Sequence, residues 1–429
     1  MFGKKWPIYE QDEIDAVTNV LKSNKVNYWT GEQGKLFEKE YAEYLGVSHT
    51  IAVANGTSAL ELCLHALGIG PGDEVIVPCR TFMASASCVV EVGAKPVVCD
   101  IDPVSQNLTV ATITPHVTAK TKAIICVHLG GWPCDMPAIM AFAEEHNLYV
   151  IEDCAQAHGA KINGKPIGSS GAPAEKSVDG SDGVDAGNSG VAARTVSGPS
   201  ASLAASGASS AGAPVGSFGH MAAFSFCQDK IISTMGEGGL VATDNEEWFK
   251  KAWAYKDHGK GYDTVYKKQH APGFRWLHDA FGSNYRMTEA QAAIGRIQLR
   301  KLPEWQKLRE RNANILNEAF TGIDGVRLVV PPAHITHAYY RFYIFVDKAH
   351  RDSVITGINQ QGLWSQVGSC SEIYLEEAFV KAGLVPKERY SNAKALGETS
   401  VALLIDHIYD EAEMRQAAQI IRDILKKYP

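Results

Sequence analysis

The stretch LYVIEDC, residues 148–154, decides the fold of this chain. Its unbroken apolar start is typical of a strand buried on both faces of a parallel sheet. Six further β-rich runs are HTIAVAN (49–55), DEVIVPC (73–79), KPVVCDI (95–101), KAIICVHL (122–129), MAAFSF (221–226) and GGLVAT (238–243). Helical stretches between them are SALELCLHALG (58–68), MASASCVVEVG (83–93) and PAIMAFAEEHN (137–147). This alternation predicts an α/β fold, with a mostly parallel sheet covered by helices on both faces.

The C-terminal third of the chain has a different organisation. A long amphipathic stretch over residues 288–320 predicts a helix that bridges to a second domain. One clear strand, YYRFYIFVD (339–347), and a final helix over residues 411–427 follow it. We therefore predict a large domain over residues 1–298 and a smaller C-terminal α+β domain over residues 299–429.

A break in composition runs from about residue 169 to residue 215. The segment consists almost entirely of Ser, Ala, Gly, Asp, Pro and Val, and it holds no aromatic residue. Such a composition cannot bury enough apolar surface to offset the entropy of ordering. We predict a low-complexity insertion in a surface loop, and an inert loop is favoured over a segment that binds a partner.

Bulk composition excludes several functional classes. The formal charge of −7 is spread along the 429 residues without a basic stripe, so we expect no nucleic acid partner. The chain starts without the apolar core of a secretory signal and has no window that could span a bilayer, so we expect no membrane partner. The nine cysteines form no CxxC pair, which predicts reduced thiols in the cytoplasm and no metal site. Among them, only Cys227, three residues before Lys230, could lie near chemistry, and its interpretation as a packing residue is favoured.

Polar and aromatic residues follow several predicted strands, at the edge where ligands of open α/β sheets bind. Gly56, Thr57 and Ser58 open a helix whose N-terminus could hold a phosphate, although Thr57 or Ser58 could also simply cap the helix. Phe82 is either a ring that stacks on a cofactor or a core residue. Asp153 ends a very apolar strand and needs a cationic partner. A protonated pyridine nitrogen, a structural ion pair and a metal site remain equal explanations.

The lysine at position 230 follows the run that delivers Ser225 to the same edge. Between Phe226 and Ile231, the amine of Lys230 would lose hydration, which favours the neutral form that makes imines. A lone lysine is more often a solvated surface residue. Here the phosphate cradle, the stacking ring, the acid and the lysine occur in the order that a pyridoxal-phosphate (PLP) site requires. The residues therefore predict PLP as the cofactor.

Six motifs are spread over residues 55–295, on both sides of the insertion. They are NGTSAL (55–60), GDEVIVP followed by TF (72–82), EDCAQAHGA (152–160), FSF followed by Lys (224–230), GEGG (236–239) and NYRMTEAQAAIG (284–295). Together they resemble the DegT/DnrJ/EryC1/StrS family of sugar aminotransferases. The resemblance implies the type I aspartate-aminotransferase fold. One departure is Cys227-Gln228-Asp229, where family members often carry a His-Pro pair.

The resemblance also implies a role for each candidate residue. Lys230 would hold PLP as a Schiff base and act as the catalytic base and acid, and Asp153 would pair with the pyridine nitrogen. Gln156 would contact the ring hydroxyl. Further implied cofactor contacts are the phosphate ligands Gly56, Thr57, Ser58 and Ser225, the stacking ring Phe82, and Asn284, which would reach the phosphate of a neighbouring subunit. This last contact implies a homodimer with shared active sites.

The implied activity is transfer of an amino group from glutamate or glutamine to a nucleotide-linked keto sugar, in amino-sugar, polysaccharide or glycoside biosynthesis. Arg286, Lys256, His258 and Arg341 could donate to carboxylate or diphosphate groups or form ordinary surface pairs. A PLP-dependent sugar dehydratase is a second interpretation, but those relatives carry histidine at the position of Lys230. A third is a regulatory or binding protein that keeps the fold without turnover and uses the insertion as a tether.

Overall fold

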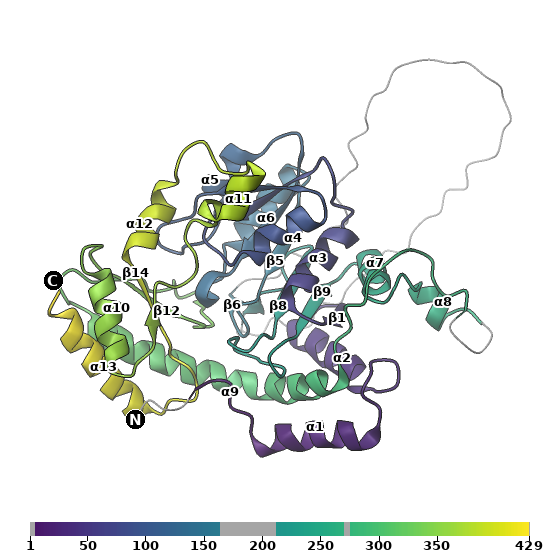
Figure 1. Cartoon of the computed structure of the whole chain (residues 1–429), viewed down its shortest axis with the longest axis horizontal. Coiled ribbons are helices and arrows are strands. Elements are labelled where there is room, and N and C mark those ends of the chain that lie inside the picture. The colour runs from purple at the N-terminus through teal and green to yellow at the C-terminus, as the bar shows by residue number, and fades with distance from the viewer. Residues whose placement is uncertain (1–4, 164–211, 270–274, 429) are drawn as a thin grey trace, which may run out of the picture.

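A computed structural model describes residues 5–163, 212–269 and 275–428 (Figure 1). Its centre is a seven-stranded sheet in the order β1-β9-β8-β5-β4-β2-β3, in which β9 alone runs antiparallel to its neighbours. The strands are β1 His49–Val53, β2 Glu74–Pro78, β3 Lys95–Cys99, β4 Thr121–Val127, β5 Tyr149–Asp153, β8 Met221–Ser225 and β9 Gly239–Thr243. All seven fall within the predicted runs except for the first residue of β4, so the predicted α/β class with a mostly parallel sheet is confirmed.

Helices cover both faces of this sheet because successive side chains of a strand point to opposite sides. Val75 and Val77 of β2 join one core with α3 and α4, whereas Ile76 joins a second core with α6. In β1, Ala52 packs in a third core with α2 and the start of α9. The helices of this part are α1 Gln11–Ser23, α2 Gln33–Leu45, α3 Gly56–Ala66, α4 Ala84–Glu91, α5 Val110–Ile113, α6 Met136–Glu145, α7 Glu246–Lys256 and α8 Tyr262–Tyr266.

The long helix α9, Glu289–Phe320, joins the two halves of the molecule (Figure 1). Its first half packs in the core beneath the large sheet, through Ala292 and Leu299 for example. Its second half packs in the C-terminal core, through Ala313 and Phe320. The boundary that we predicted between residues 298 and 299 thus falls inside one continuous helix, and the division into two domains stays a prediction.

The C-terminal part is built on a four-stranded antiparallel sheet in the order β10-β12-β14-β13. The predicted strand and final helix are both present, as β12 and α13. The elements are β10 Arg327–Leu328, β12 Phe342–Phe345, α10 Arg351–Gln360, β13 Ser365–Gln366, α11 Glu377–Ala382, α12 Ser391–Thr399, β14 Ser400–Leu403 and α13 Glu411–Leu425.

The predicted insertion lies mostly outside the described residues, which resume at Gly212. Its last residues correct our boundary. Strand β7, Ala213–Pro214, pairs with β6, Lys161–Ile162, which in turn pairs with β11, Ile335–Thr336. Val215 is buried in the core that holds α2. Residues 212–215 therefore belong to the folded protein, because small apolar residues can still fill a short strand and a core position. Within the described ranges, no helix is long and apolar enough to cross a membrane.

Candidate active site

A cavity of about 1070 Å³ opens at the carboxyl edge of the large sheet. Because strands β2, β5 and β8 are parallel, their carboxyl ends meet at this edge, and residues that are far apart in sequence come together there. The cavity is also walled by residues of the C-terminal part. The predicted site residues that line it are Gly56, Thr57, Ser58, Phe82, Asp153, Gln156, Ser225 and Lys230.

The N-terminus of α3 forms one end of the cavity. Asn55 caps this helix, since its side chain accepts a hydrogen bond of 2.8 Å from the backbone N–H of Ser58. This corrects the expectation that Thr57 or Ser58 would be the cap. At Gly56 a Cβ atom would lie 2.6 Å from the Cβ of Ser225, so only glycine lets the helix start approach β8 this closely. Exposed amides and the helix dipole make this end suited to a phosphate.

Asp153 is a buried carboxylate at the end of β5. Its Oδ2 accepts a hydrogen bond of 2.8 Å from the Ser85 hydroxyl, and its Oδ1 accepts one of 3.1 Å from the backbone N–H of Ala155. Burial raises the pKa of Asp153, although these bonds and the charge of Lys230 oppose the rise. A cation in the cavity would therefore stabilise the charged form. Sequence reasoning missed Ser85, whose only signal was its place just after the edge of β2.

Two neighbours of Asp153 are also fixed in place. The side-chain oxygen of Gln156 accepts a hydrogen bond of 2.7 Å from the backbone N–H of Gly130. The side-chain nitrogen of Gln156 can therefore donate to a ligand. His158 is buried between the Tyr41 hydroxyl, at 3.0 Å, and the carbonyl oxygen of Ser225, at 2.8 Å. Burial lowers the pKa of His158 to about 4, so a neutral imidazole supports the end of β8.

Lys230 sits on a loop that the N-terminal segment holds. The indole N–H of Trp6 donates a hydrogen bond of 2.6 Å to the backbone carbonyl of Lys230. On the same loop, the backbone N–H of Met235 donates a hydrogen bond of 3.1 Å to the Tyr9 hydroxyl. The Lys230 side chain is only 15% exposed and points into the cavity. Cys227, which we interpreted as a packing residue, lines the cavity too, because the loop turns out of the sheet directly after Phe226.

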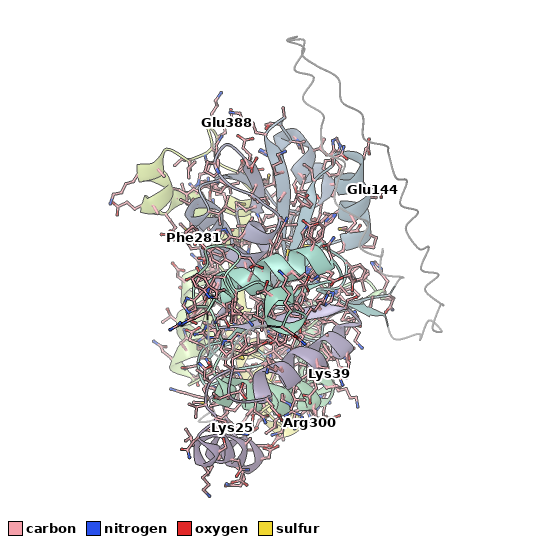
Figure 2. All side chains as sticks on the ribbon, turned by 90° about the vertical axis from the view of Figure 1, so that its right-hand side faces the viewer. Lys25, Lys39, Glu144, Phe281, Arg300 and Glu388 are labelled. Carbon is pink, nitrogen blue, oxygen red and sulfur yellow. The ribbon has the colours of Figure 1, made fainter. Side chains whose placement is uncertain are left out.

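Phe82 and Asn284 occupy different environments. Phe82 is 69% exposed although it lines the cavity, so it is not a core residue. Its ring is accessible for stacking. Asn284 is not among the residues that line the cavity. Its backbone forms a β-bridge with that of Asp257. Phe281, three residues before Asn284, is fully exposed (Figure 2). The predicted role of Asn284 in a neighbouring subunit stays a prediction.

The wall opposite the sheet comes from the C-terminal part. It includes Tyr340, Arg341, Tyr343, Trp364, Gln366, Gly368, Ser369 and Cys370. A second cavity of about 680 Å³ shares Asp229, Arg341, Trp364 and Gln366 with the first. Of the four possible hydrogen-bond donors considered from the sequence, Arg286, Lys256, His258 and Arg341, only Arg341 lines the main cavity. Lys256 is buried beside Glu38, and Arg286 forms an ion pair with Asp257, with 2.6 Å between Nη1 and Oδ1.

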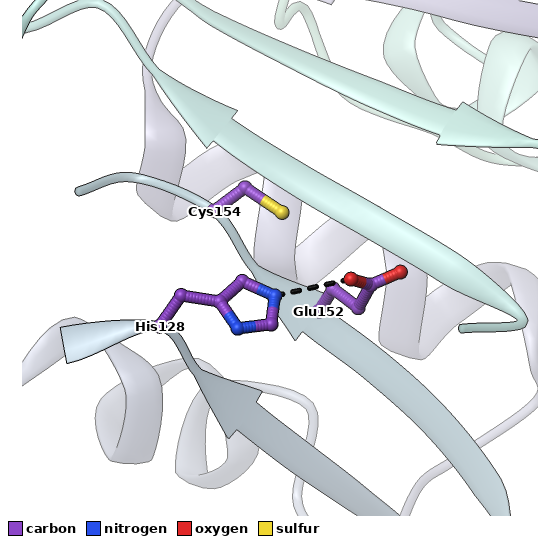
Figure 3. Close-up of side chains that lie close together, drawn as sticks. All are labelled: His128, Glu152 and Cys154. Carbon is purple, nitrogen blue, oxygen red and sulfur yellow. Dashed lines mark hydrogen bonds and ion pairs between the residues drawn. The ribbon is translucent and has the colours of Figure 1, made fainter. Parts of the chain in front are cut away.

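His128, Glu152 and Cys154 lie together behind the site, close enough to suggest a metal centre (Figure 3). However, the Glu152 carboxylate already accepts hydrogen bonds from His128 Nε2 and from the backbone N–H groups of Gly216, Phe218 and Gly219. His128 Nδ1 accepts from the backbone N–H of Cys134. Both ring nitrogens and both carboxylate oxygens are thus in use. Through these bonds the cluster attaches residues 216–219, which lead into β8, to the end of β5 next to Asp153.

The cavity fits PLP. The α3 N-terminus suits its phosphate, the exposed ring of Phe82 suits its plane, and the buried Asp153 suits a protonated ring nitrogen. Lys230 supplies an amine for covalent attachment. These features have the polarity and order that the cofactor needs, and they line one cavity.

Comparisons with known proteins agree with this geometry. The profile of the DegT/DnrJ/EryC1/StrS aminotransferase family matches residues 7–190 and 201–424. UDP-N-acetyl-3-dehydro-alpha-D-glucosamine 3-aminotransferase of Acidithiobacillus ferrooxidans is 37% identical over 83% of this chain and 79% of its own. GDP-perosamine synthase of Caulobacter vibrioides is 36% identical, over 84% and 82%.

Among solved structures, the aminotransferase from Psychrobacter cryohalolentis superposes with a TM-score of 0.85. It is 44% identical, with 99% of each chain covered. This match confirms the type I fold that the motifs implied. The predictions of an aminotransferase and of PLP as its cofactor are confirmed as well. The chain therefore belongs to the DegT/DnrJ/EryC1/StrS aminotransferase family.

Proposed function

We propose that this protein transfers an amino group from glutamate or glutamine to the keto group of a nucleotide-linked sugar. The observation that carries the proposal is the single cavity in which Lys230, the buried Asp153 and the α3 N-terminus meet. The relatives named above support the acceptor class, since their names specify a UDP-linked and a GDP-linked sugar. The reaction would serve amino-sugar and polysaccharide biosynthesis.

In this proposal each residue has one task. Lys230 would hold the cofactor through its amine and, when that amine is free, would carry a proton at the reacting carbon. Asp153 would pair with the protonated ring nitrogen, and Gln156 would donate to the ring hydroxyl. The remaining contacts are the phosphate ligands Gly56, Thr57, Ser58 and Ser225 and the stacking ring Phe82. When bound, PLP supplies the electron sink that makes the transfer possible.

The size of the two cavities, about 1070 and 680 Å³, and the cation that lines both of them support a large acceptor with phosphate groups. The two cavities share a wall at Arg341, whose guanidinium lies 4.9 Å from the ring centroid of Trp364. A cation beside an aromatic ring at the junction suits a substrate that carries both phosphates and rings. The intact lysine argues against the dehydratase interpretation.

We further propose a homodimer with shared active sites. Trp276 is 92% exposed and Phe281 is fully exposed, on the segment that carries Asn284. Large apolar side chains this exposed are typical of a surface that a partner covers. A second copy would bury them and bring Asn284 to the neighbouring phosphate site. We also propose the cytoplasm as its location, since all nine cysteines are free thiols.

The amino-transfer assay tests this function directly. The PLP-loaded protein is incubated with glutamate or glutamine and with UDP- or GDP-linked keto sugars, and both the keto acid and the amino sugar are measured. We expect both products in equal amounts, and neither with Lys230→Ala. If PLP binds but no pairing of donor and acceptor transfers nitrogen, the proposed function is wrong and a regulatory or binding role takes its place.

A further inference from the structure

The hydroxyl of Tyr340 lies between the amine of Lys230 and two further charged groups. Tyr340 Oη is 3.4 Å from Lys230 Nζ and 3.1 Å from Arg341 Nη2, and it donates a short hydrogen bond to Asp229 Oδ2. The amine also lies 3.6 Å from Asp229 Oδ1. These four residues all line the main cavity, although Tyr340 is 110 positions away from Lys230.

The direction of each bond follows from the protons available. A phenol has one proton, and Tyr340 gives it to the Asp229 carboxylate, which can only accept. The lone pairs of the phenol oxygen therefore face Lys230 and Arg341, which act as donors. Burial raises the pKa of Tyr340 far above its usual range, and the charge of Asp229 adds to this, so the phenol keeps its proton. Tyr340 thus presents a fixed acceptor to the lysine.

The phenol is held much more firmly than the carboxylate. Tyr340 is 6% exposed and packs in the core with α2, whereas the side chain of Asp229 is 50% exposed. The guanidinium of Arg341 lies 3.9 Å from the ring centroid of Tyr340. It also donates a hydrogen bond of 2.9 Å to the backbone carbonyl of Tyr340. The ring is therefore fixed from three sides before Lys230 contacts it.

We propose that Tyr340 is a positioning residue that holds the amine of Lys230 whenever the lysine is not attached to the cofactor. Asp229 and Arg341 orient the phenol for this purpose. The inference rests on the proposed role of Lys230, whose free amine must stay near the reacting carbon to carry a proton. The proton moves only between Lys230 and that carbon, and Tyr340 keeps its own proton throughout.

The first test uses the cofactor-free protein, so it does not depend on activity. Lys230 is acylated at one fixed pH with an amine-directed anhydride, and the labelling rate of its peptide is measured by mass spectrometry against the exposed Lys39. Without this acceptor the amine is no longer held at the cavity wall, so it should meet the reagent more often. We expect Tyr340→Phe to label about fivefold faster, since one hydrogen bond of typical net strength is lost. Asp229→Asn should change the rate in the same direction.

The matched control is Tyr343→Phe, which removes the same atom from another wall residue. The Tyr343 hydroxyl accepts from the backbone N–H of Ser369, at 3.2 Å, rather than contacting the lysine. Labelling of Lys230 in this variant should stay at the wild-type rate. Labelling within twofold of wild type in Tyr340→Phe would overturn the inference, and so would equal acceleration in Tyr343→Phe.

A second readout separates positioning from general structural damage. With PLP bound, the half-reaction with the amino donor is followed by stopped-flow absorbance. Tyr340→Phe should lower the rate at saturating donor about fivefold while KM for the donor stays within twofold. A change confined to KM would contradict the inference. Failure of the underlying function looks different, because the wild type itself would then not react with any amino donor while the labelling result still reports on Tyr340.

Discussion

Replacing Glu152 with glutamine should strongly destabilise the protein. The carboxylate is fully buried and accepts four hydrogen bonds, two at each oxygen. Oε1 accepts from the backbone N–H groups of Phe218 and Gly219, at 2.8 and 2.6 Å. Oε2 accepts from that of Gly216, at 2.8 Å, and from His128 Nε2, at 3.0 Å. Through these bonds one side chain attaches the chain after the insertion to β5.

The size of the effect follows from counting donors. Glutamine keeps one acceptor oxygen, so in either orientation its amide group faces two N–H donors that it cannot accept from. His128 cannot relieve the conflict by changing tautomer, because its Nδ1 already accepts from Cys134. A buried unsatisfied donor costs about 1–3 kcal/mol, so we expect a loss of roughly 2–6 kcal/mol. Domain stabilities are about 5–15 kcal/mol, so this loss is large.

Equilibrium urea unfolding, followed by tryptophan fluorescence, measures the loss. The control is Glu91→Gln, the same change on the exposed end of α4, which should stay within about 0.5 kcal/mol of wild type. A loss below about 1 kcal/mol in Glu152→Gln would refute the reasoning from donor counts. A drop in wild-type stability on adding a metal chelator would instead show that His128, Glu152 and Cys154 hold an ion.

Three further results are expected. Asp153→Asn should weaken PLP binding about 10- to 100-fold, the range for a bond to a charged group, as measured by absorbance titration; unchanged affinity would contradict its pairing with the ring nitrogen. His158 has a pKa of about 4 in the folded state against 6.5 in the unfolded chain, so the unfolding free energy should fall as the pH drops from 6.5 towards 4. His158→Gln should reduce that slope by up to about 1.4 kcal/mol per pH unit in urea unfolding, and an unaltered slope would argue against a neutral buried imidazole. Trp276→Asp combined with Phe281→Asp should convert a dimer to monomers in light scattering, whereas an unaltered mass would place the dimer surface elsewhere.

Most of the large sheet, and the cavity residues at its carboxyl edge, were predictable because both depend on local patterns. A strand buried on both faces reads as an apolar run, and a ligand site on a parallel sheet follows the ends of such runs. Gly56, Asp153 and Ser225 were found in this way. The helix cap at Asn55 was missed because three residues within four positions, Asn55, Thr57 and Ser58, are all good caps, and backbone geometry decides among them.

Contacts between distant elements could not be predicted. Tyr340 meets Lys230 only because the C-terminal sheet packs over the cavity, and no spacing in the sequence signals that meeting. Glu152 looked like one of two acids at a strand end, and the backbone groups that it binds lie more than 60 residues away. The end of the insertion was misplaced because Ala213 and Pro214 share its composition, although they form a strand with β6.

The visible absorption spectrum of the purified protein with PLP tests the central claim most directly. It is recorded before and after addition of glutamate, beside Lys230→Ala. The account predicts a yellow band in the wild type that glutamate bleaches, and no such band in the variant. A band of equal strength in Lys230→Ala would contradict the assignment of the lysine, and a wild type that forms no band would contradict the proposed active site as a whole.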